Sequence, residues 1–296
     1  MEIESVLSGI KKNVLLRDYT AFKIGGSAKY FFTANNKEDL IKAILLAKKL
    51  KLPFFIFGGG SNLLVSDEGF EGLTIKVQSS DFEVRSCEIF TEAGVLLNQL
   101  VIIALKNNLT GLEWAAGIPG TVGGAIFGNA GAFGKSIGDL IEEVEVLDSE
   151  SEKIKILGNK DCKFSYRNSL FKKNKNLIIL SAIFQLKKEK KSEIERKIKE
   201  YLDYRRETQP LNFPSAGSVF KNPLGFSAGD LIEKSGLKGK KIGDVKISEK
   251  HANFILNLEK GRARDVIELI KLIKKEVKNK FGIALEEEIQ YLGFKN

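Results

Sequence analysis

Residues 115–134 combine seven glycines with apolar side chains and read AAGIPGTVGGAIFGNAGAFG. Glycine inside an element costs about 0.5–1 kcal/mol relative to alanine, so this density needs a physical reason. A flexible linker would be polar, whereas these glycines alternate with Ala, Ile, Val and Phe. The pattern predicts a buried series of turns whose bare N–H groups bind a phosphate-bearing cofactor. A purely structural glycine-rich turn is the alternative.

A second glycine segment, GGGSNLL at residues 58–64, directly follows a short buried strand predicted at 54–57. Three glycines followed by Ser and Asn present N–H groups and short polar side chains at a sheet edge. One such segment can be an ordinary turn, but two in one chain favour a ligand with an extended pyrophosphate body. The stretch 115–134 has neither the spacing of a nucleoside-triphosphate loop nor that of the G-x-G-x-x-G fingerprint.

The titratable side chains narrow the possible chemistry. The chain has one histidine, His251, and two distant cysteines, Cys87 and Cys162. No multi-histidine metal centre, zinc site or disulfide framework is supported, and we expect no metal. Acid–base chemistry therefore has to rest on Ser, Tyr, Lys, Arg or carboxylates.

Arg167 lies among three aromatic residues in the segment FSYRNSLF at 164–171. It is either a surface cation lying over aromatic rings or a preorganised clamp for an anion. Ser218 lies in the turn-rich segment 215–223.

Hydrophobic periodicity predicts the elements that must position these segments. Strands are expected at 28–33, 54–57, 73–77, 142–147, 177–186 and 245–247, a hairpin at 82–93, and a terminal strand within 283–292. Helices are expected at 37–50, 95–107, 191–206, 228–235 and 263–281. Asn36 is the expected cap of the first helix and Gly282 the stop of the last. The break at 209–214 indicates a domain boundary.

Composition excludes some classes of function. With 43% hydrophobic residues, no apolar run of membrane-spanning length and no signal-peptide core, we expect a cytoplasmic protein without membrane insertion. The net charge of +9 favours anionic ligands. Because the lysines are interspersed with glutamates, we expect no nucleic-acid role.

Taken in order, the segments resemble the UDP-N-acetylenolpyruvoylglucosamine reductase family (UDP-N-acetylmuramate dehydrogenase, MurB). The resemblance covers nearly the whole chain, and the short connection after Phe171 is similar to the shorter form that lacks a substrate-covering loop insertion. The motifs that carry it are TAFKIGG at 20–26, GGGSNLL at 58–64, AGIPGTVGG at 116–124, GNAG at 128–131, YRNS at 166–169, GSVFKNP at 217–223, HANFI at 251–255 and LEEE at 285–288.

The resemblance implies an α+β fold. It consists of an FAD-binding fold of the vanillyl-alcohol-oxidase (PCMH) type in two subdomains, followed by a C-terminal α+β substrate domain. The expected divisions are FAD-binding subdomain 1 at 1–80, to which the strand in 283–296 returns, subdomain 2 at 81–190, a linker helix at 191–210, and a substrate-binding domain at 211–282. A monomer is expected.

The activity implied is that of an NADPH-dependent flavoenzyme with non-covalent FAD. It reduces the enolpyruvyl group of UDP-N-acetylglucosamine enolpyruvate to give UDP-N-acetylmuramate, a peptidoglycan precursor. Its expected partners are this substrate and NADPH as hydride donor. The expected cofactor-binding residues are Gly58, Gly59, Gly60, Ser61, Asn62, Leu63, Ala116, Gly117, Ile118, Gly120, Thr121, Gly123, Gly124, Asn129 and Gly131.

By the same resemblance, Arg167, Ser218 and Glu288 are the expected catalytic residues. Ser218 is the expected proton donor, and Arg167 with Glu288 is expected to act on the substrate carboxylate. The expected substrate-binding residues are Tyr166, Lys221 and Asn222. Gln290 departs from the family pattern, which often has a basic residue at this place.

Two other functions remain open from the sequence. One is an FAD-dependent oxidase of the same fold that acts on another small alcohol or sugar. The other is a non-catalytic protein that binds flavin or a UDP-sugar, which would leave the segment around Ser218 unexplained.

Overall fold

The computed structural model describes residues 3–294, which divide into two compact units. The first contains the chain up to Lys11, Phe31–Gly59 and Leu73–Arg205. The second contains Lys12–Tyr30, Gly60–Gly72 and the chain from Arg206 onward. None of the helices formed by the described residues is long and apolar enough to cross a bilayer.

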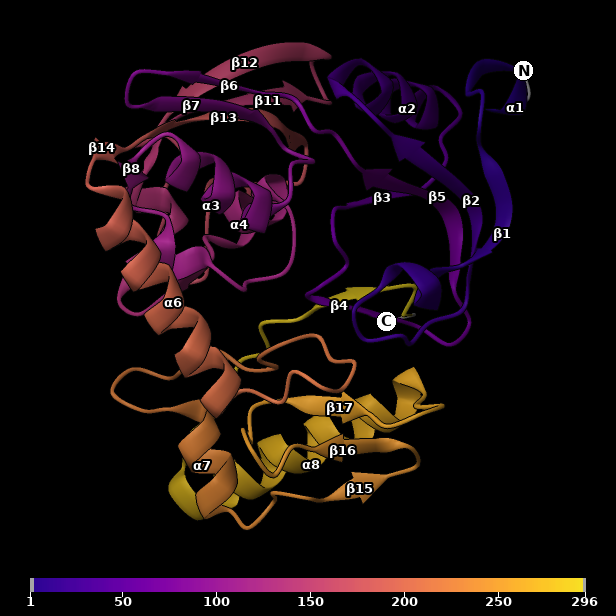
Figure 1. Cartoon of the computed structure of the whole chain (residues 1–296). Helices are drawn as coiled ribbons and strands as arrows, with labels where there is room; N and C mark the ends of the chain where they lie inside the picture. Colours follow the sequence, from indigo (N-terminus) through magenta and orange to yellow (C-terminus); the bar gives the residue numbers. More distant parts are fainter. Residues whose placement is uncertain (1–2, 295–296) are drawn as a thin grey trace. The chain divides into compact units, whose positions relative to one another are not determined.

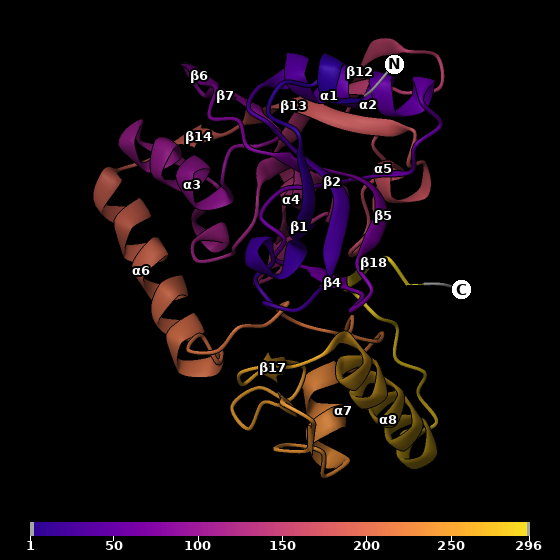
Figure 2. The same cartoon turned by 90° about the vertical axis from the view of Figure 1, so that its right-hand side faces the viewer.

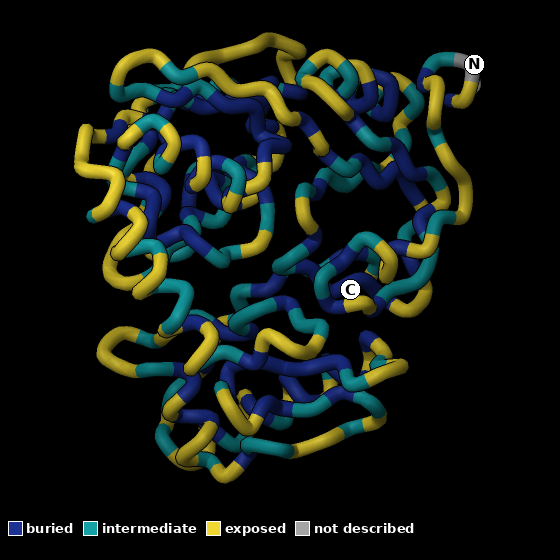
Figure 3. The backbone as a smooth tube through the Cα atoms, in the orientation of Figure 1, coloured by how far each residue is buried: buried dark blue, intermediate teal, exposed yellow. Residues whose placement is uncertain are grey.

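A five-stranded antiparallel sheet forms the framework of the first unit, in the order β12–β11–β13–β7–β6 (Figure 1). Its strands are β6 (Phe82–Arg85), β7 (Glu88–Glu92), β11 (Ile141–Asp148), β12 (Lys153–Gly158) and β13 (Leu177–Gln185). Val144 pairs with Ala182, and Ile183 with Phe90. Because β13 is central, its side chains are almost all buried, whereas β12 at the edge is largely exposed (Figure 3).

Helices pack on this sheet around a large apolar core that includes the fully buried Trp114. The helices of the first unit are α1 (Ile3–Val6), α2 (Lys37–Lys49), α3 (Leu97–Lys106), α4 (Val122–Gly128), α5 (Leu170–Lys173) and α6 (Lys191–Thr208, which ends just past the division), with short 3-10 turns η2 (Glu113–Ala115) and η3 (Ile137–Asp139). Its remaining strands are β3 (Phe54–Phe57), β8 (Leu109–Thr110), β9 (Gly131–Ala132), β10 (Lys135–Ser136) and β14 (Lys187–Lys188).

A second core lies in the second unit, where α8 (Ala263–Phe281) packs on a three-stranded antiparallel sheet and α7 (Ala228–Lys234) lies beside α8 (Figure 2). That sheet is formed by β15 (Lys241–Ile242), β16 (Val245–Ile247) and β17 (Ile255–Asn257). The apolar residues of α8 recur along one face, which is the face it buries. The helix ends at Gly282, whose φ of 72° is the left-handed conformation that glycine adopts without strain.

Two further strands of the second unit join segments that are distant in sequence. β4 (Leu63–Val65) pairs in parallel with β18 (Gln290–Leu292), so the segment after the three glycines lies beside the end of the described chain. The 3-10 turn η1 (Leu16–Tyr19) lies in the same unit. The remaining sheet has the order β1–β2–β5–β3, and the division between the units falls within β1 (Lys11–Leu15), β2 (Ser27–Ala34) and β5 (Phe70–Val77).

The expected helices and most expected strands are confirmed within one to three residues. Asn36 caps α2 as expected, because its side chain accepts a 2.8 Å hydrogen bond from the Asp39 amide. The glycine stretch 115–134 is not only a series of turns, since its centre forms α4. The terminal strand is shorter than 283–292, and the edge strand β12 was not expected. The finer domain boundaries near 80, 190, 210 and 282 stay a prediction.

Candidate active site

The two glycine segments contact each other in the first unit, where Gly58 and Gly59 pack against Gly120 and Thr121. A Cβ added at Gly58 would lie 2.1 Å from Thr121 Oγ1, and one at Gly59 would lie 2.9 Å from the Cα of Gly120. Part of the glycine requirement therefore comes from this close approach rather than from a ligand. Because the contact joins residues about sixty positions apart, neither segment reveals it alone.

Two adjacent glycines of the stretch differ in whether they have such an internal cause. A Cβ on Gly123 would lie 2.8 Å from the Ala93 Cβ, but one on Gly124 would meet only Thr121 Oγ1, at an ordinary 3.6 Å. Within residues 3–294 the amides of Gly59, Gly120 and Thr121 donate no hydrogen bond. Amides with no acceptor inside the protein favour the binding of an anionic cofactor.

The first residues of the stretch are fixed by their own hydrogen bonds. The Gly117 amide donates to Asn98 Oδ1 at 2.9 Å, and the Ile118 amide donates to the Ala115 carbonyl at 3.0 Å. Ala116 is buried. The Thr121 side chain caps α4 by accepting a 3.4 Å hydrogen bond from the Gly124 amide.

The end of the glycine stretch is bonded to the segment that carries Arg167. Asn129 Nδ2 donates to the Ser165 carbonyl at 2.8 Å, while its Oδ1 accepts from the Gly138 amide at 3.0 Å. Arg167 Nη1 donates to the Gly131 carbonyl at 2.9 Å. The side chain of Asn129 is thus engaged inside the protein, and a contact with cofactor at Asn129 or Gly131 stays a prediction.

Arg167 occupies the third position of a tight turn closed by hydrogen bonds between Ser165 and Asn168. Its φ of 52° is left-handed, a conformation that glycine or asparagine adopts more easily at this position. Its guanidinium lies 5.6 Å from the ring centroid of the exposed Tyr166. Lys172 Nζ donates a 3.0 Å hydrogen bond to the Arg167 carbonyl. Strain held in place by surrounding bonds is typical of functional positions. This geometry favours the preorganised clamp over the loose surface cation.

The second unit brings the other half of the second glycine segment beside Glu288. Asn62 Nδ2 donates to the Glu288 carbonyl at 3.1 Å, and the Gln290 amide donates to the Asn62 carbonyl at 2.9 Å. Leu63 then enters β4 and pairs with Gln290. Gly60 has a φ of 60°, and a Cβ there would lie 2.4 Å from the Tyr19 carbonyl, so its glycine has a structural reason.

Ser218 lies in a short extended segment held from both sides in the second unit. On one side Ser218 bridges Phe254, and the Val219 amide donates to the Asn253 carbonyl at 2.9 Å. On the other side the Glu288 amide donates to the Val219 carbonyl at 2.7 Å. The structure therefore brings together Ser218, Glu288 and Asn62, which are far apart in the sequence.

The three adjacent carboxylates have different surroundings. Glu286 pairs with Lys221, whose side chain is only 17% exposed. Glu287 binds Lys274 Nζ at 2.7 Å and accepts a 2.8 Å hydrogen bond from the Tyr291 hydroxyl. Burial, with help from Glu287, raises the pKa of Tyr291, so this phenol stays a donor. Glu286 and Glu287 therefore each serve a local ion pair.

Asn222 and Asn253 have structural bonds of their own. Asn222 Oδ1 accepts a 2.9 Å hydrogen bond from the Ala228 amide at the start of α7. The buried Asn253 was given no role from the sequence, yet its side chain bonds both the amide and the carbonyl of Phe220, at 2.9 and 2.8 Å. The Asn253 side chain thus bonds the Phe220 backbone as a neighbouring strand would. The only sequence signal for this role is the place of Asn253 in the motif at 251–255.

The lone histidine is a structural residue in this unit. His251 packs edge-on against Phe254, with the ring centroids 4.8 Å apart, and its Nδ1 accepts from the Asn253 amide at 3.3 Å. Burial lowers the pKa of His251, which keeps the imidazole neutral near neutral pH.

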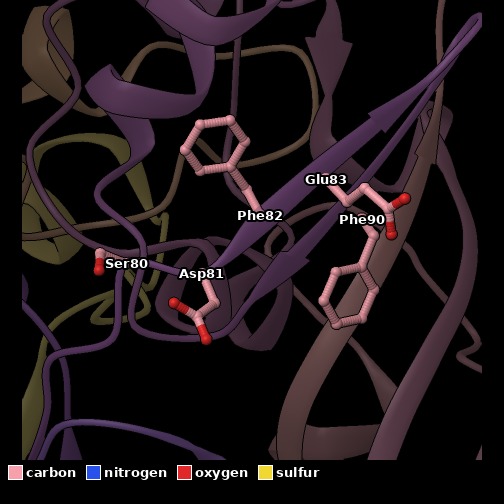
Figure 4. Close-up of a pocket in the computed structure, with 5 residues that line it drawn as sticks. All are labelled: Ser80, Asp81, Phe82, Glu83 and Phe90. Atoms are coloured by element: carbon pink, nitrogen blue, oxygen red, sulfur yellow. The ribbon is translucent and has the colours of Figure 1, made fainter.

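A shallow surface hollow is separate from all these residues. It is lined by Ser80, Asp81, Phe82, Glu83 and Phe90 at the β6–β7 hairpin (Figure 4). None of the expected catalytic, cofactor or substrate residues lines it, so we assign it no part in catalysis.

Comparison with known proteins places this geometry in a family. Residues 209–292 match the model described as UDP-N-acetylenolpyruvoylglucosamine reductase, C-terminal domain, and residues 28–157 match that of an FAD binding domain. The chain is 46% identical over 284 residues to the UDP-N-acetylenolpyruvoylglucosamine reductase of Caldanaerobacter subterraneus subsp. tengcongensis, covering 96% of this chain and 93% of that one. It is likewise 46% identical to that of Caldicellulosiruptor bescii, covering 99% and 95%.

A solved structure agrees with the sequence matches. The crystal structure of UDP-N-acetylenolpyruvylglucosamine reductase (MurB) from Thermus caldophilus superposes with a TM-score of 0.82 at 36% identity, covering 96% of this chain and 99% of that one. Together with the FAD-binding match, this confirms the expected α+β flavoprotein fold. The chain belongs to the UDP-N-acetylenolpyruvoylglucosamine reductase family.

Proposed function

We propose that the protein is an FAD-containing oxidoreductase, a UDP-N-acetylmuramate dehydrogenase that acts in peptidoglycan precursor synthesis. It reduces the enolpyruvyl group of UDP-N-acetylglucosamine enolpyruvate to UDP-N-acetylmuramate with NADPH. Family membership over nearly the whole chain supports this activity. The observation that carries it at the level of residues is the gathering of Ser218, Glu288 and the Asn62 loop in the second unit.

When bound, FAD would supply the transfer of a hydride from NADPH to the substrate. The residues proposed to hold it are those of the two glycine segments, in which the amides of Gly59, Gly120 and Thr121 have no acceptor in the described chain. We propose that these amides bind its phosphates.

Ser218 is proposed to donate the proton that completes the reduction. Hydride arrives at the terminal methylene carbon of the enolpyruvyl group, so negative charge develops at the carbon next to the carboxylate. The hydroxyl of Ser218 protonates that carbon. The backbone of the adjacent Val219 is hydrogen-bonded on both sides, so the segment that carries Ser218 is held in place before substrate arrives, which favours an efficient general acid.

Arg167 is proposed to bind the substrate carboxylate and to stabilise the charge that spreads onto it. A guanidinium fixed by its turn and by the Gly131 carbonyl needs little reorganisation when that charge develops. For Glu288 we propose a part in orienting the substrate carboxyl group. Tyr166, Lys221 and Asn222 are proposed substrate contacts, with Lys221 acting as a cation held in place by Glu286.

A Ser218→Ala variant tests the assignment by separating the two half-reactions. Reduction of the flavin by NADPH should keep its wild-type rate, because no proton from Ser218 is used there. Reoxidation by the enolpyruvyl substrate should slow by about 10²–10⁴-fold, the usual contribution of a general acid. Both rates are measured by anaerobic stopped-flow absorbance of the flavin. Reoxidation at the wild-type rate would show that another group donates the proton.

The same experiment on the wild-type protein separates the rival functions. Flavin that bleaches with NADPH and recovers with the enolpyruvyl sugar supports the reductase. Recovery only with oxygen would instead indicate an oxidase of the same fold, and no reduction at all a non-catalytic binding protein. We also propose that the enzyme is a cytoplasmic monomer, which light scattering of the purified holoenzyme tests for the oligomeric state.

A further inference from the structure

Helix α6 has a buried arginine, Arg205, at a position of its apolar face where an apolar residue is expected. Ile198, Tyr201 and Leu202 pack on the core of the first unit, and Ile194, one turn earlier on the same helix, is buried. Arg205 continues this face and is 7% exposed. Apart from Ile194 it is the only residue of α6 that is buried within the described chain.

The guanidinium of Arg205 bonds to the backbone that opens the glycine stretch. Its Nε donates to the Ala116 carbonyl at 2.9 Å and its Nη2 to the Trp114 carbonyl at 3.1 Å. Within residues 3–294 it forms no ion pair with a carboxylate, and burial lowers the pKa of the guanidinium. A buried cation whose hydrogen bonds all go to backbone carbonyls, without a carboxylate partner, is expensive, so its presence needs a function beyond packing.

The same turn of α6 packs on the glycine stretch at Gly117. This residue has a φ of 77°, and a Cβ there would lie 3.0 Å from Leu202 Cδ2 and 3.1 Å from Arg205 Cδ. The helix therefore rests directly on bare backbone.

The far end of the stretch touches α6 through Phe133. Phe133 and Gly134 join β9 to β10 with φ values of 55° and 73°, which is the geometry of a hairpin turn that favours Asn-Gly. Phenylalanine is strained there, yet its ring lies 4.5 Å from that of Tyr201 and 5.2 Å from that of Tyr204. Arg205 lies 5.5 Å from the same ring.

We propose that the last turns of α6 clasp the glycine stretch 115–134 at both ends and hold it ready for flavin, with Arg205 as the positioning residue. The clasp consists of Tyr201, Leu202, Tyr204 and Arg205 on the helix, and of Trp114, Ala116, Gly117 and Phe133 on the stretch. Its role in flavin binding rests on the proposed function of the stretch, whereas its mechanical effect does not.

Two variants open the clasp from opposite sides. Arg205→Met keeps the apolar stem but removes both hydrogen bonds. Phe133→Asn removes the ring contacts while supplying the residue that this hairpin turn prefers, so the turn itself is kept. Arg205→Lys keeps a charge and one donor and should restore part of the effect. The control is Arg196→Ala, since Arg196 lies on the exposed face of α6 and pairs only with Glu193 and Glu200.

The first readout is hydrogen–deuterium exchange of the apoprotein. In Arg205→Met and Phe133→Asn, exchange should rise in peptides covering 114–134 while β11 and β13 keep their protection. The second readout is the FAD dissociation constant, from quenching of flavin fluorescence. It should rise about tenfold or more in both variants and stay unchanged in Arg196→Ala.

Unchanged exchange at 114–134 in both variants would overturn the clasp. Faster exchange with an unchanged FAD dissociation constant would overturn its role in flavin binding. Faster exchange over the whole first unit in Arg205→Met would show that Arg205 stabilises the unit in general and does not position the glycine stretch. If Arg205→Met does not fold, Phe133→Asn decides, because it leaves the buried cation in place. Failure of the stretch to bind flavin at all is detected separately by Gly124→Ala, as described below.

Discussion

Two residues of the site depend on contacts that their own neighbours in sequence do not supply. The left-handed backbone of Arg167 lies in a turn closed locally by Ser165 and Asn168, and its guanidinium is fixed by the distant carbonyl of Gly131. A left-handed conformation costs a non-glycine residue about 1–2 kcal/mol. Ser218 in turn depends on Asn253, whose side chain pairs with the backbone of Phe220.

We predict that Asn253→Asp misplaces Ser218. The carboxylate keeps the size of asparagine but replaces the donor to the Phe220 carbonyl with a second acceptor. Stability should fall by about 1–3 kcal/mol, the cost of a broken buried hydrogen bond. Flavin reoxidation by substrate should slow in stopped-flow traces, while reduction by NADPH stays normal.

Asn257→Asp is the matched control for this variant. Asn257 is equally buried, and its side chain bonds the Phe22 carbonyl and the Gly261 amide rather than the Ser218 segment. It should lose similar stability in chemical denaturation without a selective effect on reoxidation. If both variants slow reoxidation equally, Asn253 acts only through the stability of the second unit.

At the scale of elements, neighbouring glycines of α4 have different causes. Gly123 lets the helix approach Ala93, so its glycine belongs to the fold. A Cβ at Gly124 would make only an ordinary contact with Thr121, so the fold does not require glycine there. If the stretch binds a ligand, the ligand is the reason for glycine at this position. Two adjacent positions of one helix thus separate a structural cause from a functional one.

We predict opposite results for the two alanine variants. Gly124→Ala should leave the apoprotein unchanged or more stable by about 0.5–1 kcal/mol, because alanine is the better helix former. Its FAD dissociation constant should rise about tenfold, since the methyl group fills the space that the cofactor needs. Gly123→Ala should lose about 1–3 kcal/mol of stability from overpacking. Thermal unfolding and flavin titration measure both; normal FAD affinity in Gly124→Ala would contradict the cradle.

How much the sequence predicts depends on the range of the cause. Helix α2 was predictable because Asn36 and its apolar spacing act within a few residues, and α8 because Gly282 ends it locally. The mutual packing of Gly58 and Thr121 was not, because it joins distant segments. Arg205 was missed for another reason: in a helix so rich in charge, a buried arginine looks like one more exposed residue.

For the molecule as a whole, the net charge of +9 suits a protein whose proposed substrates are anionic. NADPH and a UDP-sugar both carry phosphate charges, and a positive protein raises their local concentration at low ionic strength. We predict that KM for NADPH rises on the order of threefold between low and high salt, with little change in kcat, because salt screens this attraction. Sodium and potassium chloride should act alike; an effect specific to one ion would indicate bound cation rather than screening.

The parallel pairing of β4 with β18 also constrains the order of events during synthesis. The hydrogen bond from Asn62 to Glu288 spans 226 positions. The loop that follows the three glycines can therefore form its contacts only after residue 288 has been synthesised. Contacts of such long range close late and slowly. On the ribosome, residues 60–63 and Ser218 emerge without the strand that holds them. A nascent chain halted before residue 288 therefore lacks this half of the site, and activity can appear only after the final strand is released.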